Sequence, residues 1–287
     1  MKILVTGATG HIGRAATLAL LNSGHQVTAF VRDPSRAQDL SQAGARIFTG
    51  DVDAQAALSE AASGQDALFW LTPPNFGAPD LLSWQSRIAA NAIRAAQQNN
   101  IRRIVNLSGF GIHQPHLGKL LQNFLHLEGL FNGSGLPVLH LRPGWFMENL
   151  LPQATPIQNE GRLYVAIDSS VALPLIATAD IAAIAAQRLS APTFKTGVED
   201  LYGPDLLTGP QVATVLSEHF GKPLTWVSMP AAAMKEVFSS LGATPQNAEL
   251  YAELFADFSH PSGPYSAPQP TATRTPTTLA TFAKGAF

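Results

Sequence analysis

The sequence predicts an α/β fold, with a doubly wound parallel sheet followed by a smaller, mostly helical carboxyl-terminal lobe. In the first half of the chain, short apolar runs alternate with helix-length segments, the order that a parallel sheet with helices on both faces requires. The first apolar run leads directly into a glycine-punctuated turn and a helix start. After Leu141, prolines at positions 143, 152 and 156 interrupt this rhythm, so we expect a different arrangement in the second half.

Strands and helices of ordinary length account for the first half of the chain. Because such alternation builds βαβ units, we expect right-handed crossovers and a ligand crevice at the carboxyl ends of the strands. Glycines at 24, 44 and 64 are placed to end the first three helices. We expect strands at 2–6, 26–31, 45–49, 66–71, 102–107 and 137–141, and helices at 11–23, 34–43, 53–62, 79–99 and about 117–133.

The second half combines short strands, helices and a proline-rich segment. We expect short strands at 163–165 and 172–175, a helix from Thr178 to Leu189, and a late strand at 199–203 that returns to the main sheet. Residues 208–257 predict a helix, a short strand at 224–228 and two more helices. Residues 259–277 hold five prolines, which favour an extended strap before a final helix at about 276–284. The expected division is a first domain at 1–150 and a discontinuous lobe at 151–287.

The turn after the first strand carries glycines at positions 7, 10 and 13, with the spacing GxxGxxG. The first permits a tight turn, the second lets the backbone approach a bound diphosphate, and the third permits close packing of helix on strand. The N–H groups of the first helical turn then face the anion. An ordinary strand-to-helix loop is the alternative, but the βαβ context favours a Rossmann dinucleotide site. The expected cofactor contacts here are Gly7, Thr9, Gly10, His11 and Ile12.

Basic residues follow the second expected strand, where the ribose of a bound dinucleotide would lie. A carboxylate there would bind the 2′-hydroxyl of NAD, whereas a cation would pair with the 2′-phosphate of NADP. Arg32 falls at the strand end, Asp33 before Pro34 has the pattern of a helix cap, and Arg36 follows. We therefore predict that Arg32 and Arg36 bind NADP, with NADPH preferred over NADH. A solvated helix start is the alternative for the arginines, and an Asp33 turned toward the ribose would favour NAD.

Residues after the other strands complete the expected crevice. The Asp51 carboxylate is placed to accept a hydrogen bond from the adenine amino group, and Val52 to pack against the ring. Phe110, Trp145 and Phe146 would form a flat apolar wall for a planar substrate, although packing between the lobes is an alternative for these aromatics. The remaining expected contacts are Thr72, Pro73, Ser108 and Pro143 for the cofactor and Asn75, Phe76 and Asn149 for the substrate.

The composition argues against several classes of function. The 287 residues carry a formal net charge of −2, and no basic run exceeds Arg102-Arg103, so we expect neither nucleic acid nor a membrane surface as a partner. There is no cysteine, which excludes thiolate catalysis and cysteine-ligated metals. His113 and His116 lack an evident third ligand, so no metal is expected. No apolar run approaches the ~20 residues of a membrane span, and no signal peptide pattern opens the chain, so the expected location is cytoplasmic.

Four segments resemble the NmrA-like branch of the atypical short-chain dehydrogenases/reductases, and within it the bacterial NADPH:quinone reductases and triphenylmethane dye reductases. They are Val5–Gly13, Val31–Pro34, Gly133–Pro137 with Leu141–Leu150, and Arg274–Leu279. The first is shared by the whole superfamily, while the third is more specific to this branch. The resemblance spans nearly the whole chain. It implies a monomer or homodimer that binds NADP in the first domain and a small-molecule substrate between the lobes.

The chain departs from the superfamily at its usual proton relay, a tyrosine followed four residues later by a lysine. No tyrosine of this chain has a lysine at that distance, and Gly129 stands where the quinone-reductase relatives often keep a lysine. Carbonyl reduction by the usual route is therefore not expected. Hydride transfer to a quinone, an activated alkene or a cationic dye needs little acid catalysis, because solvent can protonate the product. The remaining candidates for a catalytic donor are Ser108, His126 and Lys119.

These observations together predict an NADPH-dependent oxidoreductase that transfers hydride to a small planar electrophile such as a quinone. Two alternatives stay open on the same scaffold. One is a non-catalytic NADP-binding sensor, since some NmrA-like proteins bind the cofactor and regulate a partner. The other is an isomerase or imine reductase.

Overall fold

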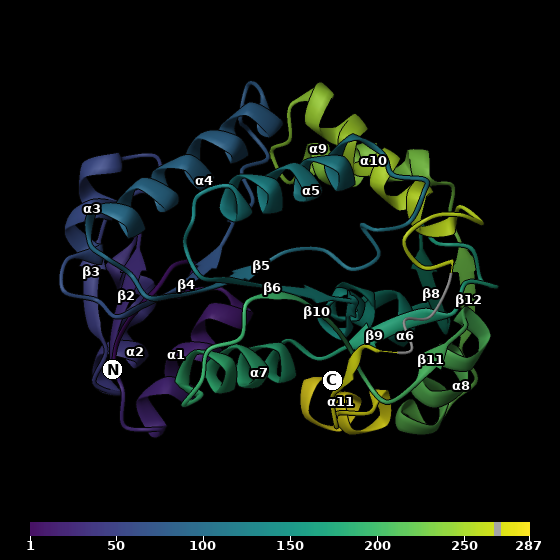
Figure 1. Cartoon of the computed structure of the whole chain (residues 1–287). Coiled ribbons are helices and arrows are strands. Elements are labelled where there is room, and N and C mark those ends of the chain that lie inside the picture. Colours follow the sequence, from purple (N-terminus) through teal and green to yellow (C-terminus); the bar gives the residue numbers. More distant parts are fainter. Residues whose placement is uncertain (267–270) are drawn as a thin grey trace.

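An eight-stranded parallel sheet runs through the molecule in the computed structural model, which describes residues 1–266 and 271–287 (Figure 1). Its order is β13-β10-β6-β5-β4-β1-β2-β3, and every neighbouring pair is parallel. The segment β3-β2-β1-β4-β5-β6 has the order of a Rossmann sheet, which confirms the predicted fold class. The bounds are β1 Lys2–Val5, β2 Gln26–Val31, β3 Arg46–Thr49, β4 Ala67–Leu71, β5 Arg103–Leu107, β6 Val138–Pro143, β10 Gly197–Tyr202 and β13 Thr273–Arg274.

The strands are apolar because helices cover both faces of the sheet. In β1, Ile3 and Val5 enter one core, and Leu4 enters the core on the opposite face, as the two-residue period of a strand requires. Figure 1 shows α1 and α7 on one side of the sheet and α4 and α5 on the other. The first side carries α1 His11–Asn22, α2 Gln38–Gln42 and α7 Thr178–Ser190, and the second carries α3 Gln55–Ala62, α4 Leu81–Gln98 and α5 Lys119–Asn132.

Capping aspartates set two helix starts near the carboxyl ends of the strands. Asp80 accepts a hydrogen bond from the Ser83 N–H at 3.0 Å, so α4 begins at Leu81 and not at 79. Asp33 caps the helical turn that begins at Pro34, as expected. The single helix expected at 34–43 was wrong, however: a 3₁₀ turn at Pro34–Ala37 precedes α2, because the backbone leaves helical geometry at Ala37, where φ is −118°.

Two small sheets and several short helices build the second lobe around a third apolar core. One sheet has the order β11-β9-β7, and the other pairs β12 with β8. The expected strands at 163–165, 172–175 and 224–228 correspond to β8, β9 and β12. The elements are β7 Trp145–Phe146, η2 Met147–Gln153, α6 Ala154–Glu160, β8 Arg162–Val165, β9 Leu173–Ile176, β11 Leu206–Leu207, α8 Gly209–Phe220, β12 Thr225–Ser228, η3 Ala231–Ala233, α9 Met234–Ser240, α10 Pro245–Ser259 and α11 Leu279–Ala286.

The carboxyl-terminal half also completes the main sheet. The late strand expected at 199–203 is β10, which pairs with β6, and α7 packs against α1. Within the strap expected at 259–277, β13 adds one further strand beyond β10. Residues 267–270 of that strap lie outside the described residues. Among the helices of the described part of the chain, none has the length and apolarity needed to cross a membrane.

Candidate functional site

A cavity of about 560 Å³ lies at the carboxyl ends of the main-sheet strands, where ligands bind in open α/β sheets. Its walls come from the turns after β1 and β3, the ends of β2, β4 and β5, and the segment after β7. The lining residues are Gly7, Thr9–Gly13, Phe30–Arg32, Arg36, Gly50–Val52, Leu71–Pro74, Trp84, Leu107, Phe146, Glu148, Asn149 and Thr178.

The glycine turn at one end of this cavity has the geometry of an anion cradle. Gly7 has a φ of +61°, a backbone conformation that side chains disfavour. A Cβ on Gly13 would lie 2.2 Å from the Gly7 carbonyl oxygen, so only glycine allows α1 to pack this closely on the turn. Gly10 caps α1 without a side chain. The first N–H groups of α1 have no partner within the helix, which suits them to a diphosphate.

Two arginines occupy the cavity wall beyond β2. Arg32 and Arg36 are exposed, and neither forms an ion pair within the described part of the chain. Arg14 of α1 donates to the Arg36 carbonyl oxygen at 2.8 Å and pairs with Asp39, which attaches the 3₁₀ turn to α1. This end of the cavity therefore presents two cations on a backbone that is held in place.

Asp33, which lies between these arginines in the sequence, forms hydrogen bonds with Ser35. Its Oδ1 accepts hydrogen bonds from the Ser35 N–H at 3.0 Å and from the Ser35 hydroxyl at 2.6 Å. These bonds hold the pKa of the Asp33 carboxyl below its usual value. Asp33 does not line the cavity.

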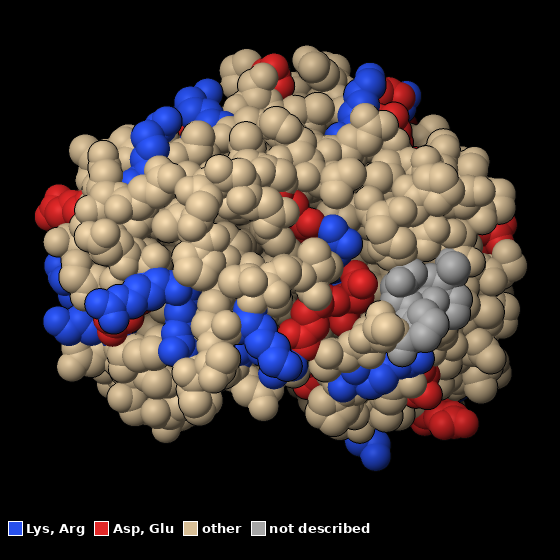
Figure 2. Space-filling model, in the orientation of Figure 1, with Lys and Arg blue, Asp and Glu red and all other residues tan. Residues whose placement is uncertain are grey.

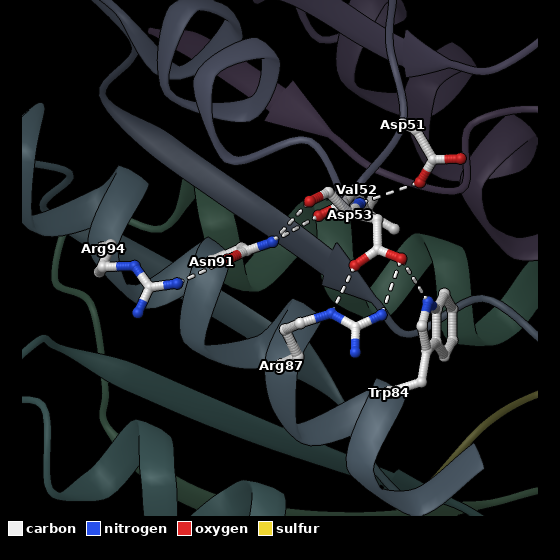
Figure 3. A network of polar contacts seen from close by, with 7 residues as sticks. All are labelled: Asp51, Val52, Asp53, Trp84, Arg87, Asn91 and Arg94. Carbon is white, nitrogen blue, oxygen red and sulfur yellow. Dashed lines mark hydrogen bonds and ion pairs between the residues drawn. The ribbon is translucent and has the colours of Figure 1, made fainter. Parts of the chain in front are cut away.

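Asp51 and Val52 line the cavity after β3, in a loop that α4 holds (Figure 3). The Nδ2 of Asn91, a buried residue of α4, donates to the carbonyl oxygens of Val52 and Asp53, both at 3.1 Å. The Asp53 N–H donates to Asp51 Oδ1 at 2.9 Å. Three bonds thus fix the backbone on which the expected adenine contacts stand.

The side chain of Asp53 strengthens the same attachment. Arg87 of α4 donates to both Asp53 oxygens, at 2.8 Å from Nε and 2.9 Å from Nη2. The indole Nε1 of Trp84 donates to Oδ2 at 2.9 Å, as Figure 3 shows. The guanidinium of Arg87 holds the pKa of Asp53 below its usual range. Trp84 also lines the cavity, so one side chain both supports the loop and forms the wall.

The structure brings most of the expected cofactor residues together. All of them line the cavity except Ser108 and Pro143. Ser108 is 8% exposed, and its Oγ has no hydrogen-bond partner among the described atoms. Pro143 lies opposite Leu201 of β10 in the main sheet.

The expected substrate residues separate into two groups. Phe146 and Asn149 line the cavity, but Asn75, Phe76, Phe110 and Trp145 do not. Phe76 packs against Phe238 and Tyr251 of the second lobe, with ring centroids 5.5 and 5.3 Å away. Trp145 belongs to the third core, because consecutive residues of a strand point to opposite faces. The expected single aromatic wall is therefore wrong, and Phe146 alone of the three aromatics faces the cofactor cavity.

None of the three candidate proton donors lines the cavity. His126 and Lys119 are exposed on α5, and Ser108 is buried. His116 lies 3.3 Å from the Asp257 carboxylate. The described residues contain no group of three or more His, Cys, Asp or Glu side chains that could hold a metal ion.

Charged side chains of α5, β6 and β10 form a cluster beside the main sheet. Glu128 of α5 accepts two hydrogen bonds from Arg142 of β6. Asp200 lies opposite Arg142 in the adjacent strand β10. Burial raises the pKa of the Asp200 carboxyl, whose Oδ1 has no hydrogen-bond partner among the described atoms. The cluster is not part of the cavity wall.

The cavity residues that were not anticipated include Glu148 and Thr178, which contact each other. Glu148 accepts hydrogen bonds from the Thr178 N–H at 2.9 and 3.1 Å and from its hydroxyl at 2.5 Å. This contact caps α7 and joins it to the segment after β7. The sequence showed the Glu148-Asn149 pair and the helix start at Thr178 separately. The hydrogen bonds between Glu148 and Thr178 could not be predicted, because the two residues are thirty positions apart.

Comparisons with known proteins agree with this geometry. A family model described as NAD(P)H-binding matches residues 7–192. Over 254 residues the chain is 29% identical to an NAD(P)H azoreductase of Xenophilus azovorans, covering 88% of this chain and 86% of that protein. Over 255 residues it is also 29% identical to quinone oxidoreductase 2 of Escherichia coli (strain K12), with the same coverage.

Solved structures share the whole fold. An NADPH-dependent quinone oxidoreductase from Escherichia coli, complexed with NADPH, superposes with a TM-score of 0.81 and 26% identity, covering 99% of both chains. A Citrobacter sp. triphenylmethane reductase complexed with NADP(H) superposes with a TM-score of 0.84 and covers 100% of both chains. The second likeness, at 21% identity, concerns the fold alone.

Proposed function

Because this chain belongs to the NAD(P)H-binding family, we propose that it is an NADPH-dependent oxidoreductase that transfers hydride to a small planar electrophile such as a quinone. The observation that carries the proposal is the cavity at the strand ends, which joins a glycine anion cradle to Arg32 and Arg36 and to the aromatic ring of Phe146. The azoreductase and quinone oxidoreductase relatives, which resemble the chain over most of its length, support the same class of reaction.

The preference for NADPH over NADH rests on the residues after β2. Arg32 and Arg36 supply charge for a 2′-phosphate, and cation–phosphate hydrogen bonds are among the stronger polar contacts in proteins. Asp33, which could instead bind the 2′-hydroxyl of NAD, is engaged with Ser35 and lies outside the cavity wall. The charge pattern therefore favours a phosphorylated ribose.

In this proposal, different residues of the cavity bind different parts of the cofactor. The amides of the Gly7–Ile12 turn bind the diphosphate, Asp51 and Val52 bind the adenine, and Thr72 and Pro73 contact the nicotinamide half. Ser108 and Pro143, which the sequence also assigned to the cofactor, lie outside the cavity wall and are not part of this assignment. When bound, the reduced nicotinamide supplies a hydride, which with one proton from water converts a quinone to a hydroquinone.

The acceptor lies at Phe146 and Asn149, which line the cavity at its second-lobe side. Phe146 offers an apolar surface to a planar ring, and Asn149 offers an amide to a polar edge. Catalysis rests on holding the acceptor next to the hydride donor, since a quinone oxygen takes its proton from solvent. The proposal needs no tyrosine–lysine pair.

The division into a cofactor domain at 1–150 and a substrate lobe at 151–287 stays a prediction. Phe146 and Asn149, at the proposed acceptor site, belong to the first segment, and β10 and β13 of the second segment belong to the main sheet. Figure 2 shows acidic and basic side chains interspersed in small groups over one face of the molecule, as suits a small-molecule partner better than a nucleic acid. The monomeric or homodimeric state and the cytoplasmic location stay predictions.

The test measures oxidation of NADPH and of NADH by the purified chain with a panel of quinones, azo dyes and triphenylmethane dyes. We expect acceptor-dependent oxidation that is faster with NADPH at limiting cofactor. Calorimetric titration of NADPH without acceptor is the companion measurement. If the chain binds NADPH but reduces none of these acceptors, the reductase proposal fails, and a cofactor-binding sensor becomes the better proposal.

A further inference from the structure

A second cavity of about 360 Å³ lies outside the cofactor site. Its walls come from separate segments: Phe110 after β5, Ala172 and Pro174 at β9, and Phe258 and Tyr265 at the end of α10 and beyond. A cavity of about 150 Å³ is enough for benzene in an engineered protein core. The second cavity can therefore hold an aromatic ring with substituents.

The walls of the second cavity suit an uncharged ring. The rings of Phe258 and Tyr265 are stacked, with centroids 4.7 Å and planes 11° apart, and Phe110 lies 6.2 Å from Tyr265. None of the described lining residues is Asp, Glu, Lys or Arg, and the polar groups are serine hydroxyls, the Tyr265 hydroxyl and His260. Apolar and aromatic walls with a few polar groups are typical of sites for small aromatic ligands.

The register of the small sheet places the second cavity beside the cofactor cavity. Phe146 of β7, which lines the cofactor cavity, lies opposite Ile176 of β9. Pro174, two residues earlier on β9, lines the second cavity. Residues two apart on a strand share a face and lie about 7 Å from each other. The two cavities therefore follow each other along one face of the same sheet.

The loop after β5 connects the two cavities as well. Leu107 lines the cofactor cavity and Phe110 lines the second one. Between them in the chain stands Ser108, whose buried hydroxyl has no partner among the described atoms. Its N–H donates to the Leu141 carbonyl oxygen at 2.8 Å, which holds the backbone at this point. The loop after β5 thus carries one wall residue of each cavity within four consecutive positions.

We propose that the second cavity binds an aryl substituent of the hydride acceptor, so that the preferred substrates are two-ring compounds such as aryl-substituted quinones. The reducible ring lies at Phe146, and the uncharged second ring lies against Phe110, Phe258 and Tyr265. The reducible ring takes up the hydride and the solvent proton, and the second ring exchanges no atoms. The proposal rests on the proposed function for the reducible ring alone.

The test compares 1,4-benzoquinone with 2-phenyl-1,4-benzoquinone as acceptors for the full chain with NADPH. Ala172→Phe places a ring in the second cavity, and we expect the ratio of kcat/KM for the phenyl compound to that for benzoquinone to fall about tenfold or more. Benzoquinone, which has no second ring, is the reference acceptor for each variant. Ala256→Phe, an exposed position on α10, is the matched control and should keep the parent ratio.

An unchanged ratio in Ala172→Phe would overturn the proposal. Leu206→Trp, on another wall of the cavity, provides a second filling variant should Ala172→Phe not fold. If neither quinone is reduced, the proposed function fails, and calorimetric titration with 4-phenylphenol then tests the cavity alone. The proposal is supported if 4-phenylphenol binds the parent and if Ala172→Phe or Leu206→Trp weakens this binding while Ala256→Phe does not. It is overturned if the parent does not bind 4-phenylphenol, or if the filling variants bind it as tightly as the parent does.

Discussion

Glu128 and Arg142 form a two-pronged ion pair in the protein interior, between α5 and β6. Arg142 Nε donates to Glu128 Oε1 at 2.9 Å and Nη2 donates to Oε2 at 2.6 Å. The side chains are 3% and 10% exposed, so water screens the pair little. Each charge therefore depends on the other for compensation.

We predict that Glu128→Leu and Arg142→Met, made singly, each lower the free energy of unfolding by about 3–5 kcal/mol, because each leaves an uncompensated charge. The double variant should recover most of this loss, since it removes both charges. Urea denaturation of the parent, the single variants and the double variant measures the effect. A double variant that loses the sum of the single losses would contradict this account of the pair.

Arg32→Glu should weaken NADPH binding by about tenfold to a hundredfold, because a charge-assisted hydrogen bond contributes roughly 1.5–3 kcal/mol. NADH binding should change much less, because NADH lacks the 2′-phosphate. Calorimetric titration with both cofactors checks this. Arg102→Glu, an exposed arginine just before the amino end of β5, is the control with the same charge change. Equal losses for NADPH and NADH would remove the role assigned to Arg32.

Gly13→Ala and Gly129→Ala form a pair of opposite expected sign. A Cβ on Gly13 would lie 2.2 Å from the Gly7 carbonyl oxygen, whereas one on Gly129 would meet no atom of the described residues within 4 Å. Gly129→Ala should stabilise the protein by up to about 1 kcal/mol through helix propensity. Gly13→Ala should destabilise it and greatly weaken NADPH binding. Thermal unfolding with and without NADPH measures both, and a Gly13→Ala protein that binds NADPH normally would refute the cradle geometry.

The pH dependence of stability should carry a contribution from His140. Its Nδ1 lies 2.9 Å from Asn106 Nδ2 and its Nε2 lies 3.1 Å from Asn132 Oδ1, a pattern that suits the neutral ring. Burial lowers the pKa of His140 below its ordinary value of 6.5. As the pH falls below about 6.5, His140 therefore takes up a proton in the unfolded chain but not in the native state. The free energy of unfolding then decreases until the pH reaches the lower pKa of His140 in the native state.

Urea denaturation of the parent and of His140→Gln over this pH range isolates that contribution. The parent should lose stability relative to His140→Gln as the pH falls below the ordinary value, because only the parent must keep a buried imidazole neutral. His126→Gln, at an exposed histidine of α5, is the control and should follow the parent. Parallel curves for the parent and His140→Gln would rule the contribution out.

The main sheet and the glycine cradle could be predicted because their signals are local. Gly7, Gly10 and Gly13 lie within seven consecutive positions, and the βαβ rhythm depends on neighbouring segments. Asp33 was likewise predicted as a cap from the Pro34 that follows it. Such features need no knowledge of distant contacts.

The errors concern positions that tertiary packing decides. Phe110 follows a main-sheet strand, but its place beside Tyr202 and Tyr265 depends on segments far along the chain. Trp145 and Phe146 were treated as one wall, and the short strand β7 sends them to opposite sides. The contact of Asp53 with Trp84, which spans 31 positions, has no local signal either.

The pairing of β10 with β6 has a consequence for any attempt to divide the protein. A fragment that stops near residue 150 would lack α7, β10 and β13, so it would expose the unpaired amide and carbonyl row of β6 and the bare underside of the first core. Open strand edges of this kind recruit other chains and promote aggregation. The nucleotide-binding half is thus not a transferable module, and a chimera that borrows it must also carry residues 178–202 and the β13 segment.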